Sequence, residues 1–130
     1  MNDPAEIRDF AKRYTAAWCS QDPASVGAFY STEGSLRVND EVPAVGRAAI
    51  TEVARGFMTT FPDLVVLMDE LVMQERVEYH WTLIGTSAGR KVRVSGFEVW
   101  EIGADGLIAE SRGSFDGAEY QRQLGAPPRS

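Results

Sequence analysis

A glutamate on an apolar strand face is the position in this chain that points most clearly to chemistry. Residues 91–102 are predicted to form one long strand, and Glu98 belongs to its alternate set. Apart from one glycine, the other members of that set are apolar or aromatic: Val92, Val94, Gly96, Trp100 and Ile102. Burying a carboxyl group on such a face is costly unless the group is protonated or paired.

Two interpretations of Glu98 follow from this placement. If the face lines a pocket, desolvation raises the pKa of Glu98 and makes it a proton donor near neutral pH. Otherwise, Glu98 is a structural acid at a subunit boundary or in a salt bridge with an arginine such as Arg112.

Glu78 and His80 form a second candidate site, on the strand predicted over residues 76–84. They share one face because side chains alternate along a strand, and a carboxylate beside an imidazole can act as an acid–base pair. If this face lines a pocket, the pair is a catalytic candidate. If it meets solvent or a partner subunit, it is an ordinary polar face, and alternation leaves both interpretations open.

The opposite face of the same strand is apolar and predicts how the chain assembles. Its members are Val77, Tyr79, Trp81 and Leu83. A sheet whose helices cover one face must bury a second apolar face in some other way. We therefore expect a homodimer formed through the sheet.

Tyr14 lies on the apolar stripe of the first predicted helix. The stripe recurs at helical spacing: Ile7, Phe10, Ala11, Tyr14, Ala17 and Trp18. A buried tyrosine hydroxyl needs a hydrogen-bond partner, so Tyr14 is either a core residue or a donor to a ligand. Cys19, next to this stripe, is interpreted as a small buried hydrophobic residue.

Composition excludes several classes of function. The 130 residues carry 13 basic and 19 acidic side chains, a net charge of −6, and 44% of them are hydrophobic. These values suit one globular domain over residues 1–130, with an ordered core over about 3–125. No basic stripe indicates a nucleic-acid partner, and no apolar run approaches the ~20 residues of a membrane span.

The same inventory indicates no cofactor and suggests a compartment. One histidine and one cysteine cannot build the common zinc sites, so no metal is expected, and no glycine-rich phosphate loop is present. A polar, acidic N-terminal stretch does not resemble a signal peptide. A lone cysteine fits a reducing environment, so we expect a cytoplasmic protein.

Helices precede strands along the chain. Asp3 and Pro4 are typical of a helix start, a short second helix follows Asp22, and a third runs from about Arg47 to the residue before Pro62. Between these two helices we expect a turn at 31–34 and a strand at 35–39. After Pro62 the apolar period changes from about 3.6 to about 2. The change predicts four strands and a closing helix, at 64–73, 76–84, 91–102, 107–115 and 117–124, followed by a tail at 125–130.

This order predicts an α+β protein with helices on one face of a curved, mainly antiparallel sheet. It resembles the nuclear-transport-factor-2-like superfamily, with its cone-shaped, cystatin-like roll, and specifically the SnoaL-like polyketide cyclase and ketosteroid isomerase branches. The resemblance covers nearly the whole chain. The residues that carry it are 14–18, 22–23, 45–50, 61–64, 80–86, 96–100, 105–110 and 123–125.

The resemblance implies roles for particular residues. Glu98 matches the protonated acid of the ketosteroid isomerase oxyanion hole, and Tyr14 matches the tyrosine that assists it, so together they would stabilise an enolate oxygen. The isomerase base falls on Val38. The catalytic aspartate of the cyclases and epoxide hydrolases falls on Gly113. Neither valine nor glycine can carry a proton.

The resemblance also implies a conical pocket between helices and sheet, and usually a homodimer. We predict that aromatic and small residues line this pocket: Trp18, Phe29, Val38, Phe57, Trp100, Ser111, Gly113 and Phe115. Several aromatics around a cone favour a small apolar or carbonyl-bearing ligand.

Two functions follow. The first is an enzyme without metal or cofactor that transfers a proton next to a carbonyl, with Tyr14 and Glu98 as oxygen stabilisers and His80 or Glu78 as base. The alternative is a non-catalytic ligand-binding or dimeric interaction module. The missing acids at Val38 and Gly113 favour this alternative, whereas the retained Glu98 and Tyr14 favour the enzyme.

Overall fold

The first helix, α1 (Pro4–Trp18), begins where its sequence provides a cap. In the computed structural model, which describes residues 3–125, the Asp3 carboxylate accepts a hydrogen bond from the Ala5 N–H at 2.9 Å. Proline at the first helical position lacks only an N–H that would be unpaired there. The apolar stripe of α1 is buried as predicted, with Tyr14 fully enclosed. Of the tail predicted at 125–130, residues 126–130 lie outside the described residues.

Two more helices cover the same side of the molecule. Helix α2 (Pro23–Gly27) is capped by Asp22, and helix α3 (Arg47–Thr60) starts after Gly46, whose φ of 92° favours glycine. Helix α3 ends before Phe61, as Pro62 predicts. Its buried stripe is Ile50, Ala54 and Met58.

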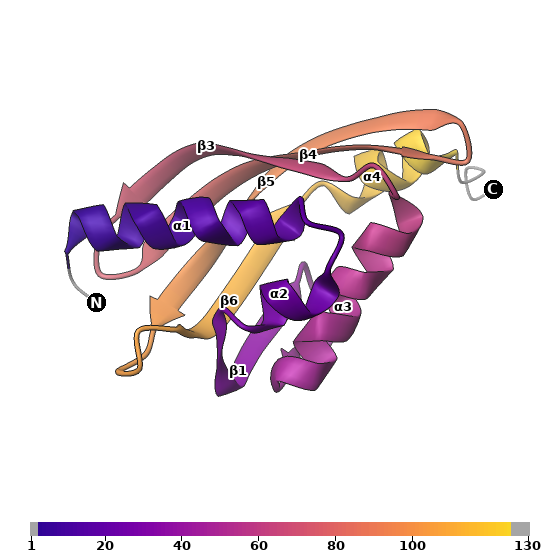
Figure 1. The fold of residues 1–130 in the computed structure, drawn as a ribbon. Coiled ribbons are helices and arrows are strands. Elements are labelled where there is room, and N and C mark those ends of the chain that lie inside the picture. The colour runs from indigo at the N-terminus through magenta and orange to yellow at the C-terminus, as the bar shows by residue number, and fades with distance from the viewer. Residues whose placement is uncertain (1–2, 126–130) are drawn as a thin grey trace.

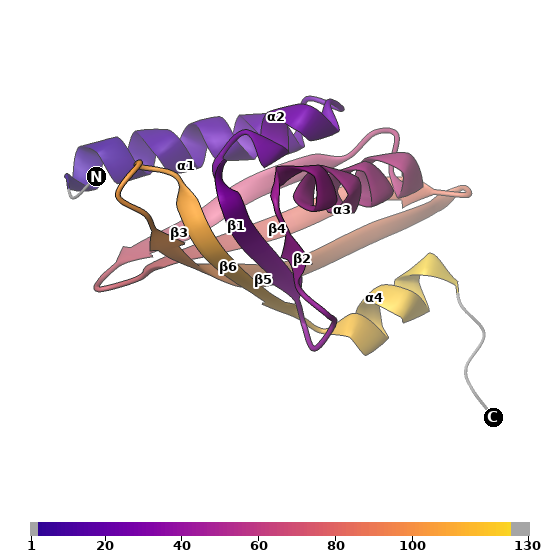
Figure 2. The same cartoon turned by 90° about the horizontal axis from the view of Figure 1, so that it is seen from below.

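Six strands form one mixed sheet, ordered β2-β1-β6-β5-β4-β3. Strands β1 and β6 are parallel, and every other neighbouring pair is antiparallel. Their bounds are β1 (Tyr30–Val38), β2 (Ala44–Val45), β3 (Val65–Met73), β4 (Val77–Ser87), β5 (Arg90–Ile102) and β6 (Ile108–Phe115). The sheet curves and stays open, with α1, α2 and α3 on its concave side (Figures 1 and 2). The predicted α+β class is confirmed.

Strand β1 differs from its prediction. Residues 31–34, expected to form a turn, belong to the strand. The register against β6 shifts between Tyr30 and Ser35, and the Gly34 carbonyl accepts the Gly46 N–H at 2.8 Å. Pairing with segments far along the sequence supplies these backbone hydrogen bonds, so local turn chemistry does not decide the conformation.

The closing helix α4 (Gly117–Leu124) has the predicted bounds. Asp116 caps it by accepting the Glu119 N–H at 3.0 Å, and Gly125 ends it with a φ of 84°. The Tyr120 ring packs edge-on against Phe115, with ring centroids 5.4 Å apart. Figure 2 shows α4 beyond the end of β6 and beside β5.

None of the helices in the described residues is long and apolar enough to cross a membrane. Within residues 3–125, no group of three histidine, cysteine, aspartate or glutamate side chains is placed to hold a metal ion.

Candidate functional site

One row of residues crosses the concave face and contains Glu98. The strand registers pair Tyr79 on β4 with Glu98 on β5, Glu98 with Gly113 on β6, and Gly113 with Val38 on β1. The two positions at which the resemblance expects carboxylates therefore lie in line with Glu98. Because they are occupied by valine and glycine, Glu98 is the one carboxylate of this row.

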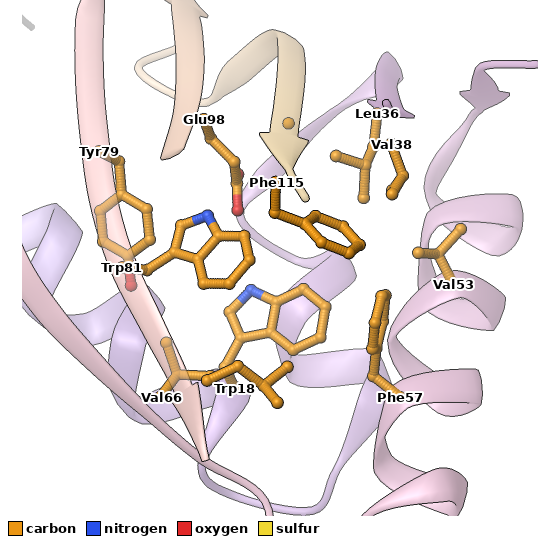
Figure 3. A pocket seen from close by; sticks show the side chains of 12 residues that line it. Trp18, Leu36, Val38, Val53, Phe57, Val66, Tyr79, Trp81, Glu98 and Phe115 are labelled. Carbon is orange, nitrogen blue, oxygen red and sulfur yellow. The ribbon is translucent and has the colours of Figure 1, made fainter. Parts of the chain in front are cut away.

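A pocket opens over this row, between the sheet and helices α1 and α3 (Figure 3). Its empty volume is about 540 Å³, part of which is open to solvent. Five aromatic side chains and six aliphatic residues or glycines line it, and its single acid is Glu98. The lining residues are Trp18, Leu36, Val38, Val53, Phe57, Val66, Tyr79, Trp81, Leu83, Glu98, Gly113 and Phe115.

The two oxygens of Glu98 have different surroundings. Oε1 accepts hydrogen bonds from Tyr14 Oη at 2.9 Å, Trp100 Nε1 at 2.9 Å and Ser111 Oγ at 2.8 Å. None of these three hydrogen bonds goes to Oε2. One oxygen therefore fixes the side chain, and the other is available to a ligand in the pocket.

Burial controls the protonation of this group. Desolvation raises the pKa of Glu98, while the hydrogen bonds from Trp100, Ser111 and Tyr14 oppose that rise because they favour the carboxylate. Burial likewise raises the pKa of Tyr14 well above its usual value, so this hydroxyl stays a donor. A raised carboxyl pKa brings Glu98 toward the range in which it can both take and return a proton.

Tyr14 acts from behind the pocket rather than inside it. It is fully buried and is not among the lining residues. Its single hydroxyl proton goes to Glu98, so Tyr30 must donate the 2.9 Å hydrogen bond that joins the two tyrosines. In this structure the Tyr14 hydroxyl therefore contacts Glu98 and Tyr30 and does not line the pocket.

Five of the eight predicted pocket residues line the cavity: Trp18, Val38, Phe57, Gly113 and Phe115. Three do not. Trp100 and Ser111 are fully buried beneath the lining and hold Glu98 Oε1. Phe29 lies between α2 and β1. Its ring packs edge-on against Phe10 and Tyr14 and does not line the cavity.

Glu78 and His80 lie on the outer face of the sheet. Their neighbours Tyr79, Trp81 and Leu83 line the pocket, so alternation places the pair on the other side. His80 Nε2 lies 3.2 Å from Glu78 Oε1, and its ring stacks on Phe97. The pocket interpretation of this pair is wrong for this structure.

The same alternation corrects the assignment of the apolar face. Val77, Tyr79, Trp81 and Leu83 were expected to face a partner subunit, but they face the helices. The Arg112 alternative for Glu98 is also wrong, because Arg112 pairs with Glu110 at 3.1 Å.

Tyr79 and Trp81 are therefore the two aromatic pocket residues that the sequence interpretation missed, beside the aliphatic Leu36, Val53, Val66 and Leu83. The signal was present in the two faces of their strand, one apolar and one polar. Helices cover the apolar face of a half-covered sheet, and assigning that face to the helices would have found both residues. The Tyr79 hydroxyl is already occupied, since it lies 2.5 Å from Thr15 Oγ1.

Trp81 carries a polar atom that the protein leaves without a partner. Its indole Nε1 is buried and makes no hydrogen bond within residues 3–125. Gly96, opposite Trp81 in the sheet, makes room for the ring, because a Cβ there would lie 2.8 Å from Trp81 Cζ2 and 2.4 Å from the Ser114 carbonyl oxygen. Glycine at this position therefore helps to shape the pocket wall.

N-terminal helices packed on a curved, open, mainly antiparallel sheet define the class of proteins with a ketosteroid isomerase-like fold. Within that class, the chain belongs to the SnoaL-like polyketide cyclase family, whose model matches residues 8–124. A comparison with curated proteins finds no match.

Solved structures agree with this fold. TsrD from Streptomyces laurentii is 24% identical, with a TM-score of 0.83, over 96% of this chain and 98% of its own. A putative SnoaL-like polyketide cyclase from Jannaschia is 16% identical, with a TM-score of 0.82, over 98% and 99%. A hypothetical ketosteroid isomerase-like protein from Catenulispora acidiphila, solved with trimethylamine, is 15% identical, with a TM-score of 0.82, over 92% and 94%.

Proposed function

We propose that the pocket binds a small, largely apolar molecule and that Glu98 transfers a proton at the carbon next to a carbonyl of that molecule. The observation that carries this proposal is the difference between the surroundings of the two oxygens of Glu98. Three donors hold Oε1, and Oε2 is left for the ligand. Membership in the SnoaL-like polyketide cyclase family supports a carbonyl-bearing ligand.

Glu98 is the proton carrier in this proposal because the pocket offers no second group for that role. Tyr79 is the other ionisable lining residue, and burial raises its pKa far above neutrality, so its hydroxyl keeps its proton. Glu98 Oε2, as a carboxylate, takes the proton from the α-carbon, and the electron pair of the C–H bond moves toward the carbonyl oxygen. The carboxylic acid then returns the proton to the same carbon or to a conjugated one.

The apolar wall favours this reaction. A carboxylate surrounded by aromatic and aliphatic side chains is poorly solvated, which makes it a stronger base than the same group in water. The hydrogen bonds to Oε1 keep the side chain in one orientation, so little reorganisation is needed when the proton moves.

The test begins with a thermal-shift panel of steroid, polyketide, terpenoid epoxide and fatty-acid-like ligands, together with 1-tetralone. A ligand present at 100 times its Kd adds about 2.7 kcal/mol, which is several degrees for a domain of this size. Ketones that bind are then incubated in D₂O, and exchange of the α-protons is followed by NMR.

The matched variants are Glu98→Gln in the pocket and Glu78→Gln on the outer face. Glutamine keeps an oxygen for the three donors and loses the ability to carry a proton. We expect Glu98→Gln to bind ketones and lose the exchange, and Glu78→Gln to exchange like the wild type. Exchange that survives in Glu98→Gln contradicts the role of Glu98. Ketone binding without exchange in the wild type favours the alternative, a ligand-binding module.

We further propose that the protein is a cytoplasmic homodimer that pairs through the outer face of the sheet. Val65 and Leu67 are 41% and 42% exposed on strand β3, and Phe97 is partly exposed on β5. Burying apolar side chains of this kind favours association. Sedimentation at micromolar concentration should give twice the chain mass of 14.3 kDa, and a monomer contradicts the proposal.

A further inference from the structure

Trp81 has the one buried side-chain N–H or O–H within residues 3–125 that lacks a hydrogen-bond partner. Buried polar groups in folded proteins are nearly always paired, and an exception needs an explanation. Trp81 belongs to the wall of the pocket that contains Glu98, but its nitrogen is covered by neighbouring protein atoms. A ligand whose acceptor atom reaches this nitrogen when the pocket wall moves would explain the unpaired group.

The sheet places Trp81 and Glu98 close to each other. Trp81 pairs with Gly96, and Glu98 lies two residues beyond Gly96 on the same face of β5, so Trp81 and Glu98 are diagonal neighbours. Figure 3 shows the indole nitrogen of Trp81 on the edge of the ring that is turned toward the Glu98 carboxyl group. An atom of a ligand between them would meet both groups.

The proposed function requires a hydrogen-bond donor to the carbonyl oxygen of the ligand, and this N–H can serve as that donor. If Glu98 takes the proton from the α-carbon, another group must stabilise the negative charge that develops on the carbonyl oxygen. Tyr14 cannot do so, because its proton is already donated to Glu98 Oε1 behind the pocket. The Tyr79 hydroxyl is occupied by Thr15.

We propose that the Trp81 indole N–H binds the carbonyl oxygen of the ligand, while Glu98 Oε2 acts on the adjacent carbon. This inference rests on the proposed function and adds a recognition rule to it. The ligand must present a ketone, ester or lactone oxygen next to an apolar body. A protonated amine does not satisfy this rule, because it pairs with the Glu98 carboxylate and has no lone pair to accept the Trp81 N–H.

The experiment uses 1-tetralone and tetralin, two molecules of nearly the same shape of which only the first has an oxygen. The indole N–H resonances of the ¹⁵N-labelled protein are followed while each is added. The chain has three tryptophans, and Trp→Phe variants assign the resonances. Trp100, whose N–H already bonds Glu98, is an internal control.

We expect 1-tetralone to move the Trp81 N–H resonance downfield, as hydrogen bonding does, and tetralin to leave it without that shift. A Trp81 resonance that responds equally to both molecules, or does not respond while 1-tetralone binds, overturns the inference and leaves the proton transfer by Glu98 standing. If neither molecule binds, the proposed function fails and the inference fails with it. An amine such as trimethylamine that binds in place of the ketone also overturns it.

A variant tests the same point by affinity. Replacing Trp81 with 3-benzothienylalanine exchanges the N–H for sulfur and keeps the shape of the ring. We expect binding of 1-tetralone to weaken about fivefold, the size of one net hydrogen bond, and binding of tetralin to stay unchanged. Equal losses for the two probes would show that the ring contributes packing alone.

Discussion

The two faces of strand β4 differ in what surrounds them, although their residues alternate along one chain. The inner face carries Tyr79 and Trp81, which line the pocket. The outer face carries Glu78 and His80, which lie 3.2 Å apart and are partly exposed. The outer pair has the more obvious acid–base chemistry. The inner face has the enclosure that makes such chemistry effective.

The same contrast separates two glutamates. Glu98 is 8% exposed and receives three hydrogen bonds on one oxygen. The side chain of Glu78 is 42% exposed and meets one histidine. An exposed carboxylate is surrounded by water and adds little to stability or catalysis. The position of a carboxyl group relative to the sheet, more than its residue type, decides its chemistry here.

Removing the two glutamates should give the largest difference. Glu98→Ala leaves the donors of Tyr14, Trp100 and Ser111 buried without an acceptor, and we expect the free energy of unfolding to fall by about 3 kcal/mol. Glu78→Ala should change it by less than about 0.5 kcal/mol. Urea denaturation measures both. Equal effects would remove the distinction between the two faces.

Two glycines of the inner face should respond differently to alanine. Gly96→Ala places a Cβ 2.4 Å from the Ser114 carbonyl oxygen and should cost about 2 kcal/mol, because strand β6 and Trp81 must shift. Gly113→Ala meets nothing closer than 3.5 Å and should cost less than about 0.5 kcal/mol. Thermal unfolding of both variants checks this prediction. A tolerant Gly96 would mean that the wall around Trp81 is not tightly packed.

Tyr14→Phe should have a smaller effect. It removes the hydrogen bonds to Glu98 and Tyr30, and we expect a cost of about 1 kcal/mol. Because the Tyr14 hydrogen bond lowers the pKa of Glu98, its loss should raise that pKa further. A carboxyl titration by NMR measures the change. A lowered pKa would show that Tyr14 does not stabilise the carboxylate.

Glu98→Gln should have the smallest effect on stability at acidic pH, and the effect should grow with pH. Burial raises the pKa of Glu98 in the folded state above the ordinary value of 4.5, which the unfolded chain keeps. Between 4.5 and the folded-state pKa, the folded protein therefore binds more protons than the unfolded chain. Wild-type stability therefore falls as pH rises through this window. Glutamine does not titrate, so the variant should gain relative to the wild type. Parallel pH–stability curves would contradict this prediction.

Much of the fold follows from local patterns. The cap at Asp3, the stop before Pro62 and the period change after it are local, and the structure confirms α1, α3 and four strands at nearly the predicted bounds. Strand β1 is different. Its first residues resemble a turn, and pairing with β2 and with the parallel strand β6, distant in the sequence, makes them part of a strand.

The site shows the same limit. The alternation in β5 placed Glu98 on an apolar face, which the structure confirms. Alternation in β4 separated two faces without showing which one the helices cover. The prediction therefore put Glu78 in the pocket and Trp81 on the opposite face, and the structure has the reverse. Only the packing of α1 and α3 settles that choice. Nothing in the sequence shows that Trp100 and Ser111 both reach the same oxygen of Glu98.

A titration of Glu98 shows directly whether this carboxyl group can carry the proton. Glutamate is labelled with ¹³C at the carboxyl carbon, and the resonance that disappears in Glu98→Gln is followed with pH. If Glu98 is the buried proton carrier of the pocket, its midpoint lies above the usual value of 4.5 and moves when a ketone binds. A midpoint at or below 4.5, unchanged by every ligand that binds, would show that Glu98 is not the buried proton carrier of the pocket.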